Sequence, residues 1–215
     1  MNQSELLEKI REKKLVPVVK LDRVEDAKPL CEALCEGGLP VAEITFRTAA
    51  AEGSIRTAAK EFPEMMVGAG TVINVEQAKR AVDAGASFLV SPGISREVTQ
   101  WALANRIPIF PGTCSPSEIM TALEYGLPVV KFFPASQYGG LEAIKALAAP
   151  FPVISFMPTG GINAQNVREY LAFEKVIACG GSWMVKDSFI KEGNFGKIRE
   201  LTREAVILVN EGGEL

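Results

Sequence analysis

Short apolar runs alternate with helix-length amphipathic segments along the whole chain. Most of these runs are continuously apolar, which is typical of parallel strands that are covered by helices. We expect eight strands, at residues 15–21, 42–46, 66–69, 88–91, 108–110, 129–133, 155–157 and 176–179. Eight strand–helix repeats predict an α/β fold, a single (β/α)8 TIM barrel with a short N-terminal helix. An open doubly wound sheet is the alternative, because a miscount of one strand would change the topology.

Local turn and capping signals support this alternation. The same order of helix end, glycine, tight turn and buried strand recurs at residues 36–40, 83–87 and 124–128. Asn74 with Gln77 resembles a capping box, and Ser115 is followed by proline and then by Glu118, which also indicates the start of a helix. Because 215 residues are few for a barrel, we expect brief loops and one domain over residues 1–215.

The composition excludes several classes of function. The chain has no histidine, so acid–base chemistry must rest on Glu, Asp, Lys, Tyr or Cys. Its four cysteines form no C-x-x-C pair, and we expect neither a metal nor another cofactor. The net charge of −3 and the lack of a basic run argue against nucleic acid as a partner. With no signal-like segment and no apolar run that could span a membrane, we expect a cytoplasmic protein.

Lys131 is the most informative single residue, because it lies within the apolar run 129–134. Burial disfavours the ammonium form, so such a lysine tends toward the neutral amine, which is a nucleophile for carbonyl carbon. This segment alone leaves an alternative open, in which the stem of the lysine packs at a strand end and its head reaches water.

The second predicted strand supplies a possible proton carrier. By the two-residue period of a strand, Glu43, Thr45 and Arg47 share one face, which we expect to point into the barrel. A lysine that forms an imine needs an acid–base group nearby, and without histidine Glu43 is the natural candidate. Arg47 could hold a carboxylate through two parallel hydrogen bonds. A buried salt bridge that only stabilises the barrel is the alternative.

Two glycine pairs follow the last two predicted strands. Gly160 and Gly161 come after the seventh strand, and Gly180 and Gly181 come after the eighth, just before Ser182. In a TIM barrel these loops are the usual phosphate site, since glycine lets backbone N–H groups approach an anion. One such pair usually marks only a turn, but two pairs in the two expected places favour a phosphate site.

Over nearly its whole length, the chain resembles the family of 2-keto-3-deoxy-6-phosphogluconate (KDPG) and 4-hydroxy-2-oxoglutarate (KHG) aldolases. The matching motifs lie, in order, at residues 43–48, 67–72, 91–93, 131–134, 158–161 and 180–183. The resemblance implies a metal-independent class I aldolase, a carbon–carbon lyase of the Entner–Doudoroff pathway. It would cleave KDPG to pyruvate and glyceraldehyde 3-phosphate, act also on KHG, and form a homotrimer.

The resemblance also implies roles for single residues. Lys131 matches the Schiff-base lysine, and Glu43 matches the proton-transferring carboxylate. The residues that match the substrate site are Arg47 and Thr71 at the pyruvate carboxylate, Pro92 and Phe133 in the pocket lining, Gly160, Gly161 and Ser182 at the phosphate, and Thr159 and Gly181 beside them. Lys20 departs from the pattern, because many relatives have an arginine there; lysine supplies charge but not a planar fork.

Three other functions remain possible from the sequence. The first is an aldolase for the galactonate epimer of the same phosphorylated sugar acid. The second is a phosphosugar isomerase or epimerase on the same barrel, in which Lys131 forms only an ion pair. The third is a catalytically silent protein that binds a phosphorylated ligand in the same pocket.

Overall fold

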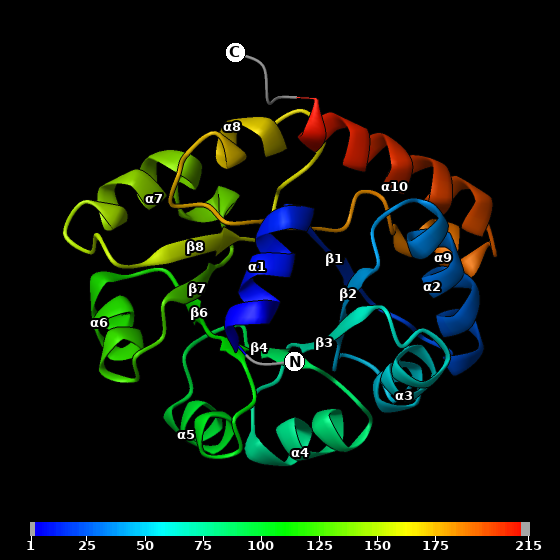
Figure 1. Cartoon of the computed structure of the whole chain (residues 1–215), viewed down its shortest axis with the longest axis horizontal. Helices are drawn as coiled ribbons and strands as arrows, with labels where there is room; N and C mark the ends of the chain where they lie inside the picture. The colour runs from blue at the N-terminus through cyan, green and yellow to red at the C-terminus, as the bar shows by residue number, and fades with distance from the viewer. Residues whose placement is uncertain (1–2, 212–215) are drawn as a thin grey trace.

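The computed structural model describes residues 3–211, in which strands and helices alternate (Figure 1). The strands are β1 (Leu15–Val19), β2 (Val41–Thr45), β3 (Met66–Gly70), β4 (Phe88–Val90), β5 (Ile109–Phe110), β6 (Gly112–Thr113), β7 (Val129–Phe132), β8 (Ser155–Pro158) and β9 (Cys179–Gly181). The α-helices are α1 (Gln3–Lys13), α2 (Ala27–Glu36), α3 (Ala51–Glu61), α4 (Val75–Asp83), α5 (Arg96–Ala104), α6 (Pro116–Glu124), α7 (Gly140–Ala148), α8 (Val167–Leu171), α9 (Asp187–Lys191) and α10 (Phe195–Asn210). Two 3-10 turns are η1 (Val24–Asp26) and η2 (Ser136–Tyr138).

All strand pairs among these elements are parallel. Six strands form one sheet in the order β5-β4-β3-β2-β1-β9, and three form a second in the order β6-β7-β8. Two isolated bridges, from Phe156 to Val176 and from Thr159 to Gly180, connect the region of β8 to the segment that contains β9. Figure 1 shows the helices placed around the strands. The protein therefore has the expected α/β fold with parallel sheets, and its architecture is TIM-barrel-like.

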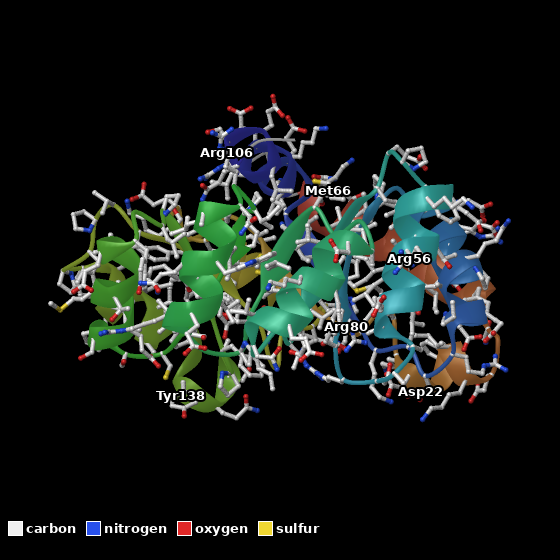
Figure 2. The ribbon with its side chains drawn as sticks, turned by 90° about the horizontal axis from the view of Figure 1, so that it is seen from below. Asp22, Arg56, Met66, Arg80, Arg106 and Tyr138 are labelled. Atoms are coloured by element: carbon white, nitrogen blue, oxygen red, sulfur yellow. The ribbon has the colours of Figure 1, made fainter. Side chains whose placement is uncertain are left out.

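Helix α1 covers the end of the sheets at which the strands begin. It lies over the strands in Figure 1, and in Figure 2, turned by 90°, it stands at the edge of the molecule near Met66, the first residue of β3. Leu6 and Ile10 on α1 are fully buried, so this helix closes the core from that side. Tyr138, which follows β7, is labelled at the opposite edge of Figure 2 and marks the carboxyl ends of the strands.

The strands differ from the expected ones at two places. The fifth strand ends at Phe110 as expected, but Pro111 separates it from a further short strand, β6, which was not predicted and which pairs with β7 instead of β4. Proline has no N–H to donate to a strand neighbour, which explains the break. The eighth strand was expected at 176–179, but β9 pairs with β1 through Cys179, Gly180 and Gly181. The second glycine pair is thus part of a strand.

The capping and turn signals are largely confirmed. Ser115 and Glu118 form a full capping box at the start of α6, and the Asn74 side chain accepts a hydrogen bond from Gln77 N at 2.8 Å. The glycines at the three recurring turns, Gly38, Gly85 and Gly126, have positive φ angles of 87°, 105° and 69°. Such angles are readily adopted only by glycine, so each helix ends there and the chain turns into the next strand.

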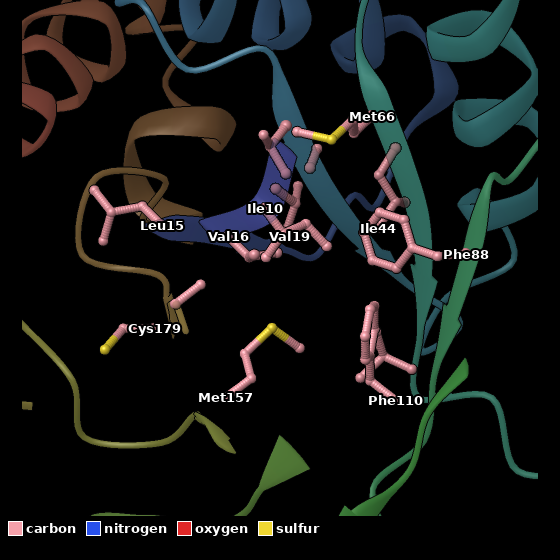
Figure 3. Packing of buried hydrophobic residues seen from close by; sticks show 14 of the residues in the cluster. Ile10, Leu15, Val16, Val19, Ile44, Met66, Phe88, Phe110, Met157 and Cys179 are labelled. Atoms are coloured by element: carbon pink, nitrogen blue, oxygen red, sulfur yellow. The ribbon is translucent and has the colours of Figure 1, made fainter. Parts of the chain in front are cut away.

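The core is one apolar cluster that runs from α1 to α10. Figure 3 shows some of its members, including Phe88 and Phe110, whose rings meet edge to face with centroids 5.8 Å apart. Gly68 on β3 is required for this packing, since a Cβ there would lie 2.2 Å from the Phe88 ring. Within residues 3–211, no helix combines the length and apolar character that crossing a bilayer requires.

Candidate active site

Lys131 and Glu43 meet in the interior of the protein. Lys131 is on β7 and Glu43 is on β2, and their side chains are only 5% and 1% exposed. The Lys131 Nζ lies 3.1 Å from Glu43 Oε1. Because β2 and β7 are not neighbours in either sheet, this contact requires both side chains to point inward across the interior. The structure therefore places the predicted nucleophile and the predicted proton carrier in direct contact.

The neighbouring strand leaves room for the carboxylate. A Cβ at Gly70 on β3 would lie 2.2 Å from Glu43 Oε1, so only glycine allows Glu43 its position. The second carboxylate oxygen, Oε2, is buried, and no atom of the described residues forms a hydrogen bond with it. A buried oxygen without a partner is costly, and it can accept a proton from a bound molecule. Glu43 thus has one oxygen in contact with the lysine and one buried oxygen that forms no hydrogen bond with the described residues.

Phe133 lies close to Lys131, and Pro92 lies close to Gly112 on the neighbouring strand. The Lys131 Nζ is 5.2 Å from the centre of the Phe133 ring, a distance at which a cation interacts with the face of an aromatic ring. Gly112 pairs with Lys131 between β6 and β7, and a Cβ on Gly112 would lie 2.2 Å from the Pro92 backbone oxygen. The chain around Pro92 therefore packs against the direct strand neighbour of Lys131.

A cavity of about 310 Å³ opens at the carboxyl ends of the strands. Eight of the predicted site residues line it, namely Lys20, Arg47, Phe133, Thr159, Gly160, Gly161, Gly181 and Ser182. Lys131 and Glu43 do not line it directly. Both lie deeper. Lys131 is next to Phe133, and Glu43 comes two residues before Thr45 along β2. Phe133 and Thr45 themselves form part of the cavity wall. The cavity therefore lies against residues that adjoin the buried pair.

Arg47 does not point into the interior, contrary to the expectation from the strand period. It lies beyond the end of β2 and is exposed at the mouth of the cavity, where its Nε donates a hydrogen bond of 3.1 Å to Thr71 Oγ1. Glu43 forms its ion pair with Lys131 and not with Arg47. Thr71 does not line the cavity itself, but it fixes the guanidinium that does.

The loop after β8 packs against the loop after β7. Gly160 and Gly161 have φ angles of +100° and +78°, and Ser136 N donates to Gly160 O at 3.0 Å. A Cβ on Gly161 would lie 1.9 Å from Ser136 Oγ. Both the backbone angle and the space therefore require glycine. Gly180, the bridge partner of Thr159, leaves room for its side chain, and the buried Thr159 Oγ1 has no hydrogen-bond partner among the described residues.

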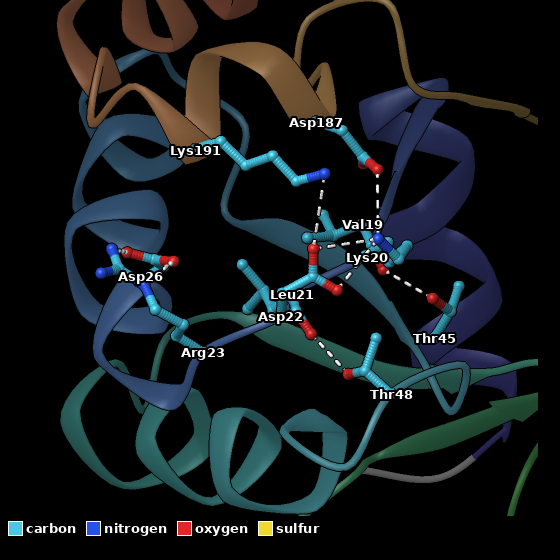
Figure 4. Close-up of polar contacts among 10 residues, drawn as sticks. All are labelled: Val19, Lys20, Leu21, Asp22, Arg23, Asp26, Thr45, Thr48, Asp187 and Lys191. Atoms are coloured by element: carbon cyan, nitrogen blue, oxygen red, sulfur yellow. Dashed lines mark hydrogen bonds and ion pairs between the residues drawn. The ribbon is translucent and has the colours of Figure 1, made fainter.

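Lys20 lies on the same wall and is held by two carboxylates (Figure 4). Its Nζ is 2.9 Å from Asp22 Oδ1 and 3.3 Å from Asp187 Oδ2. The hydrogen bond to Asp22 is the main cause that raises the pKa of Lys20, and the same bond is the main cause that lowers the pKa of Asp22. The sequence did not single out Asp187, which also lines the cavity; its one signal was its position shortly after Ser182.

These features define a class of protein. A lysine in contact with a buried carboxylate lies under a cavity whose walls carry two cations and a glycine-rich loop. The cavity opens at the carboxyl ends of parallel strands, the end at which TIM-barrel-like enzymes carry their active sites. The class is therefore an α/β protein with an enzyme-like site for an anionic ligand.

The comparisons with known proteins agree with this class. The family model "KDPG and KHG aldolase" matches residues 6–201. A 2-dehydro-3-deoxy-phosphogluconate aldolase of Treponema pallidum is 46% identical over 205 residues, which is 95% of this chain and 96% of that protein. A KHG/KDPG aldolase of Escherichia coli is 44% identical over 201 residues, covering 94% of this chain and 92% of that one. The chain therefore belongs to the KDPG and KHG aldolase family, as the sequence motifs implied.

A solved structure extends the similarity to the whole fold. The KDPG aldolase of Legionella pneumophila, in which pyruvate was captured as a covalent carbinolamine intermediate, superposes with a TM-score of 0.88. It shares 42% identity and covers 91% of this chain and 95% of its own.

Proposed function

We propose that this protein is a class I aldolase that cleaves KDPG to pyruvate and glyceraldehyde 3-phosphate and acts also on KHG. The observation that carries the proposal is the contact of 3.1 Å between the buried Lys131 Nζ and Glu43 Oε1 beneath a cavity for an anionic ligand. Membership of the family and the names of the relatives support the same reaction. The carbinolamine captured in the Legionella enzyme is the first covalent intermediate of such a route.

The reaction begins with the amine of Lys131. Its lone pair attacks the C2 carbonyl carbon of the substrate, and loss of water gives an iminium ion. Glu43 takes the proton from the C4 hydroxyl, directly or through a water molecule, and the C3–C4 bond breaks as its electron pair moves toward the iminium nitrogen. The aldehyde leaves, and an enamine of pyruvate remains on Lys131. The proton on Glu43 then returns to C3, and hydrolysis of the new iminium releases pyruvate and restores the amine.

The residues around the mouth of the cavity bind the substrate during this reaction. Arg47, fixed by Thr71, binds the carboxylate next to the reacting carbonyl, and Phe133 and Pro92 form the apolar wall beside the imine. The phosphate lies at the other end of the cavity, against backbone N–H groups of the glycine-rich loop. The residues proposed for it are Thr159, Gly160, Gly161, Gly181, Ser182 and Lys20, all of which line the cavity.

We propose further that the two sheets act as one closed (β/α)8 barrel and form a single domain. Only Pro111 separates β5 from β6, so these two strands continue one another. The bridges from Phe156 to Val176 and from Thr159 to Gly180 support closure between β8 and β9. The apolar cluster that runs from α1 to α10 supports one domain. Backbone hydrogen exchange that is slow in all nine strands would agree with closure, whereas fast exchange confined to β8 and β9 would contradict it.

A homotrimer in the cytoplasm is the proposed setting, because the family resemblance implies that assembly. Light scattering on the purified protein is expected to give three times the mass of one chain. A mass equal to that of one chain at catalytic concentrations would contradict the trimer and leave the reaction untouched.

The function is tested by the products that the protein makes. KDPG, its galactonate epimer and KHG are supplied separately, and the release of pyruvate is followed with a coupled enzyme. We expect release from KDPG and from KHG, and none from the Lys131→Met variant. If the galactonate epimer were cleaved faster than KDPG, the substrate assignment would pass to that epimer. If no pyruvate appeared from any of the three, the aldolase assignment would be wrong.

A further inference from the structure

The cation proposed for the phosphate end of the cavity is already paired. Lys20 Nζ lies between Asp22 Oδ1 at 2.9 Å and Asp187 Oδ2 at 3.3 Å. Figure 4 shows that the two carboxylates approach Lys20 from different elements, Asp22 from the loop after β1 and Asp187 from the first residue of α9. A phosphoryl group that reaches Lys20 therefore also comes close to negative charge.

The two carboxylates differ in what they face. Asp187 lines the cavity together with Lys20 and Arg47, whereas Asp22 does not. Asp22 has a second cation, since Lys191 Nζ lies 3.7 Å from its Oδ2. Among the contacts of the described residues, Asp187 has no cation other than Lys20. The charge of Asp22 is thus balanced outside the cavity, while the charge of Asp187 forms part of its wall.

The electrostatic consequence depends on the substrate. A phosphate carries about −1.5 to −2 charges near neutral pH, and a carboxylate beside it repels it. KDPG carries its phosphate on C6, at the far end from the keto group. In KHG the distal carboxylate follows C4 directly, so it lies nearer to the reacting carbons and farther from Asp187. The repulsion therefore acts mainly on the phosphorylated substrate.

We propose that Asp187 is a specificity-determining residue. It lowers the preference of this enzyme for phosphorylated over unphosphorylated 2-keto acids. The proposal rests on the aldolase function proposed above. The Asp187 carboxylate weakens the attraction between the cavity and the phosphoryl group of the substrate. Lys20 keeps this part of the cavity cationic enough to bind the phosphoryl group. An enzyme that acts on both kinds of substrate needs such a balance, because the charge of Lys20, if unopposed, would favour the phosphorylated substrate.

The test compares the two substrates in the Asp187→Asn variant. We expect kcat/KM for KDPG, divided by kcat/KM for KHG, to rise about two- to fivefold, the range of exposed charge interactions. The change should appear as a lower KM for KDPG with kcat nearly constant. Inorganic phosphate should also inhibit the variant more strongly than the parent. Salt at high concentration should shrink both differences, since exposed charges are screened.

Two matched variants separate charge from position. Asp187→Glu keeps the charge and should retain the ratio of the parent, whereas Asp22→Asn loosens Lys20 without changing the cavity wall and should move the ratio less than Asp187→Asn. A ratio that does not rise in Asp187→Asn, or that rises equally in Asp22→Asn, would overturn the role of Asp187 and leave the aldolase function standing. A parent enzyme that releases no pyruvate from either substrate would overturn the function itself.

Discussion

Two ion-paired lysines in this protein occupy opposite environments. Lys131 and Glu43 are almost fully enclosed, with 5% and 1% of their side chains exposed, and each has the other as its ion-pair partner. Lys20 is 31% exposed and shares its charge with Asp22 and Asp187, which are about half exposed. Removing one partner of a buried pair leaves an isolated charge away from water, whereas water replaces a lost partner at the surface.

We propose that the two regions have different roles in catalysis. At the buried pair the covalent bond to the substrate forms and the proton is transferred, so substitutions there should alter the chemical step. At the rim of the cavity, where Lys20, Asp22 and Asp187 lie, solvent screens each charge. Substitutions there should therefore change which substrate binds and how tightly.

Replacing Lys131 should abolish the reaction and weaken the fold. In Lys131→Met, no amine is left to form the imine, and Glu43 becomes a buried carboxylate without a cation. We expect no measurable turnover and a loss of about 3–5 kcal/mol in the free energy of unfolding, measured with urea. Lys131→Arg is the matched control, because it keeps a cation without a nucleophilic amine. It should be equally inactive but lose less stability.

Replacing Glu43 should remove proton transfer and leave the nucleophile in place. Glu43→Gln keeps the shape of the side chain but cannot accept the proton of the C4 hydroxyl. We expect kcat to fall about 10²–10⁴-fold, with a parallel loss of proton exchange at C3 of pyruvate. Proton exchange at the rate of the parent protein would show that another group carries the proton.

Replacing a glycine of the glycine-rich loop should have an intermediate effect on substrate binding. Gly161→Ala must adopt a positive φ angle and place a Cβ where Ser136 Oγ now lies, so the loop has to shift. We expect KM for KDPG to rise about tenfold or more, because strain of about 1–3 kcal/mol falls on the phosphate end. Gly193→Ala is the control, since it also has a positive φ angle of 66° but no neighbour within 4 Å of a new Cβ. It should leave KM unchanged.

The smallest effect is expected at Lys20. Lys20→Arg supplies a planar fork in place of a single ammonium group, but Asp22 and Asp187 occupy part of its donor capacity. We expect KM for KDPG to change by less than about fivefold, as for other exposed charge pairs. A change of a hundredfold or more would show that the rim is coupled to the chemical step, and the division between the two regions would then be wrong.

The sequence predicted the buried region better than the rim. The apolar run around Lys131 and the two-residue period that isolates Glu43 are local signals, and both lead directly to the interior. Depth along a strand is not local: β2 ends at Thr45, so Arg47 lies outside although it follows the same period. Asp187 lies 167 residues from Lys20 in the chain, and only the pairing of β9 with β1 brings α9 to that wall.

The strand bounds show the same limit. Gly180 and Gly181 have the composition of a loop, but β9 is extended there because β1 supplies the hydrogen bonds. A strand that is defined by its partner cannot be predicted from its own residues, since propensity is weaker than pairing in a parallel sheet.

The central claim is that Lys131 forms an imine with the keto acid. The most direct measurement is to incubate the protein with pyruvate and sodium borohydride, record the intact mass, and map the modified residue by peptide sequencing. We predict one reduced pyruvate adduct per chain, on Lys131, that is absent in Lys131→Arg. An unmodified mass, or an adduct on another lysine that persists in Lys131→Arg, would contradict the account.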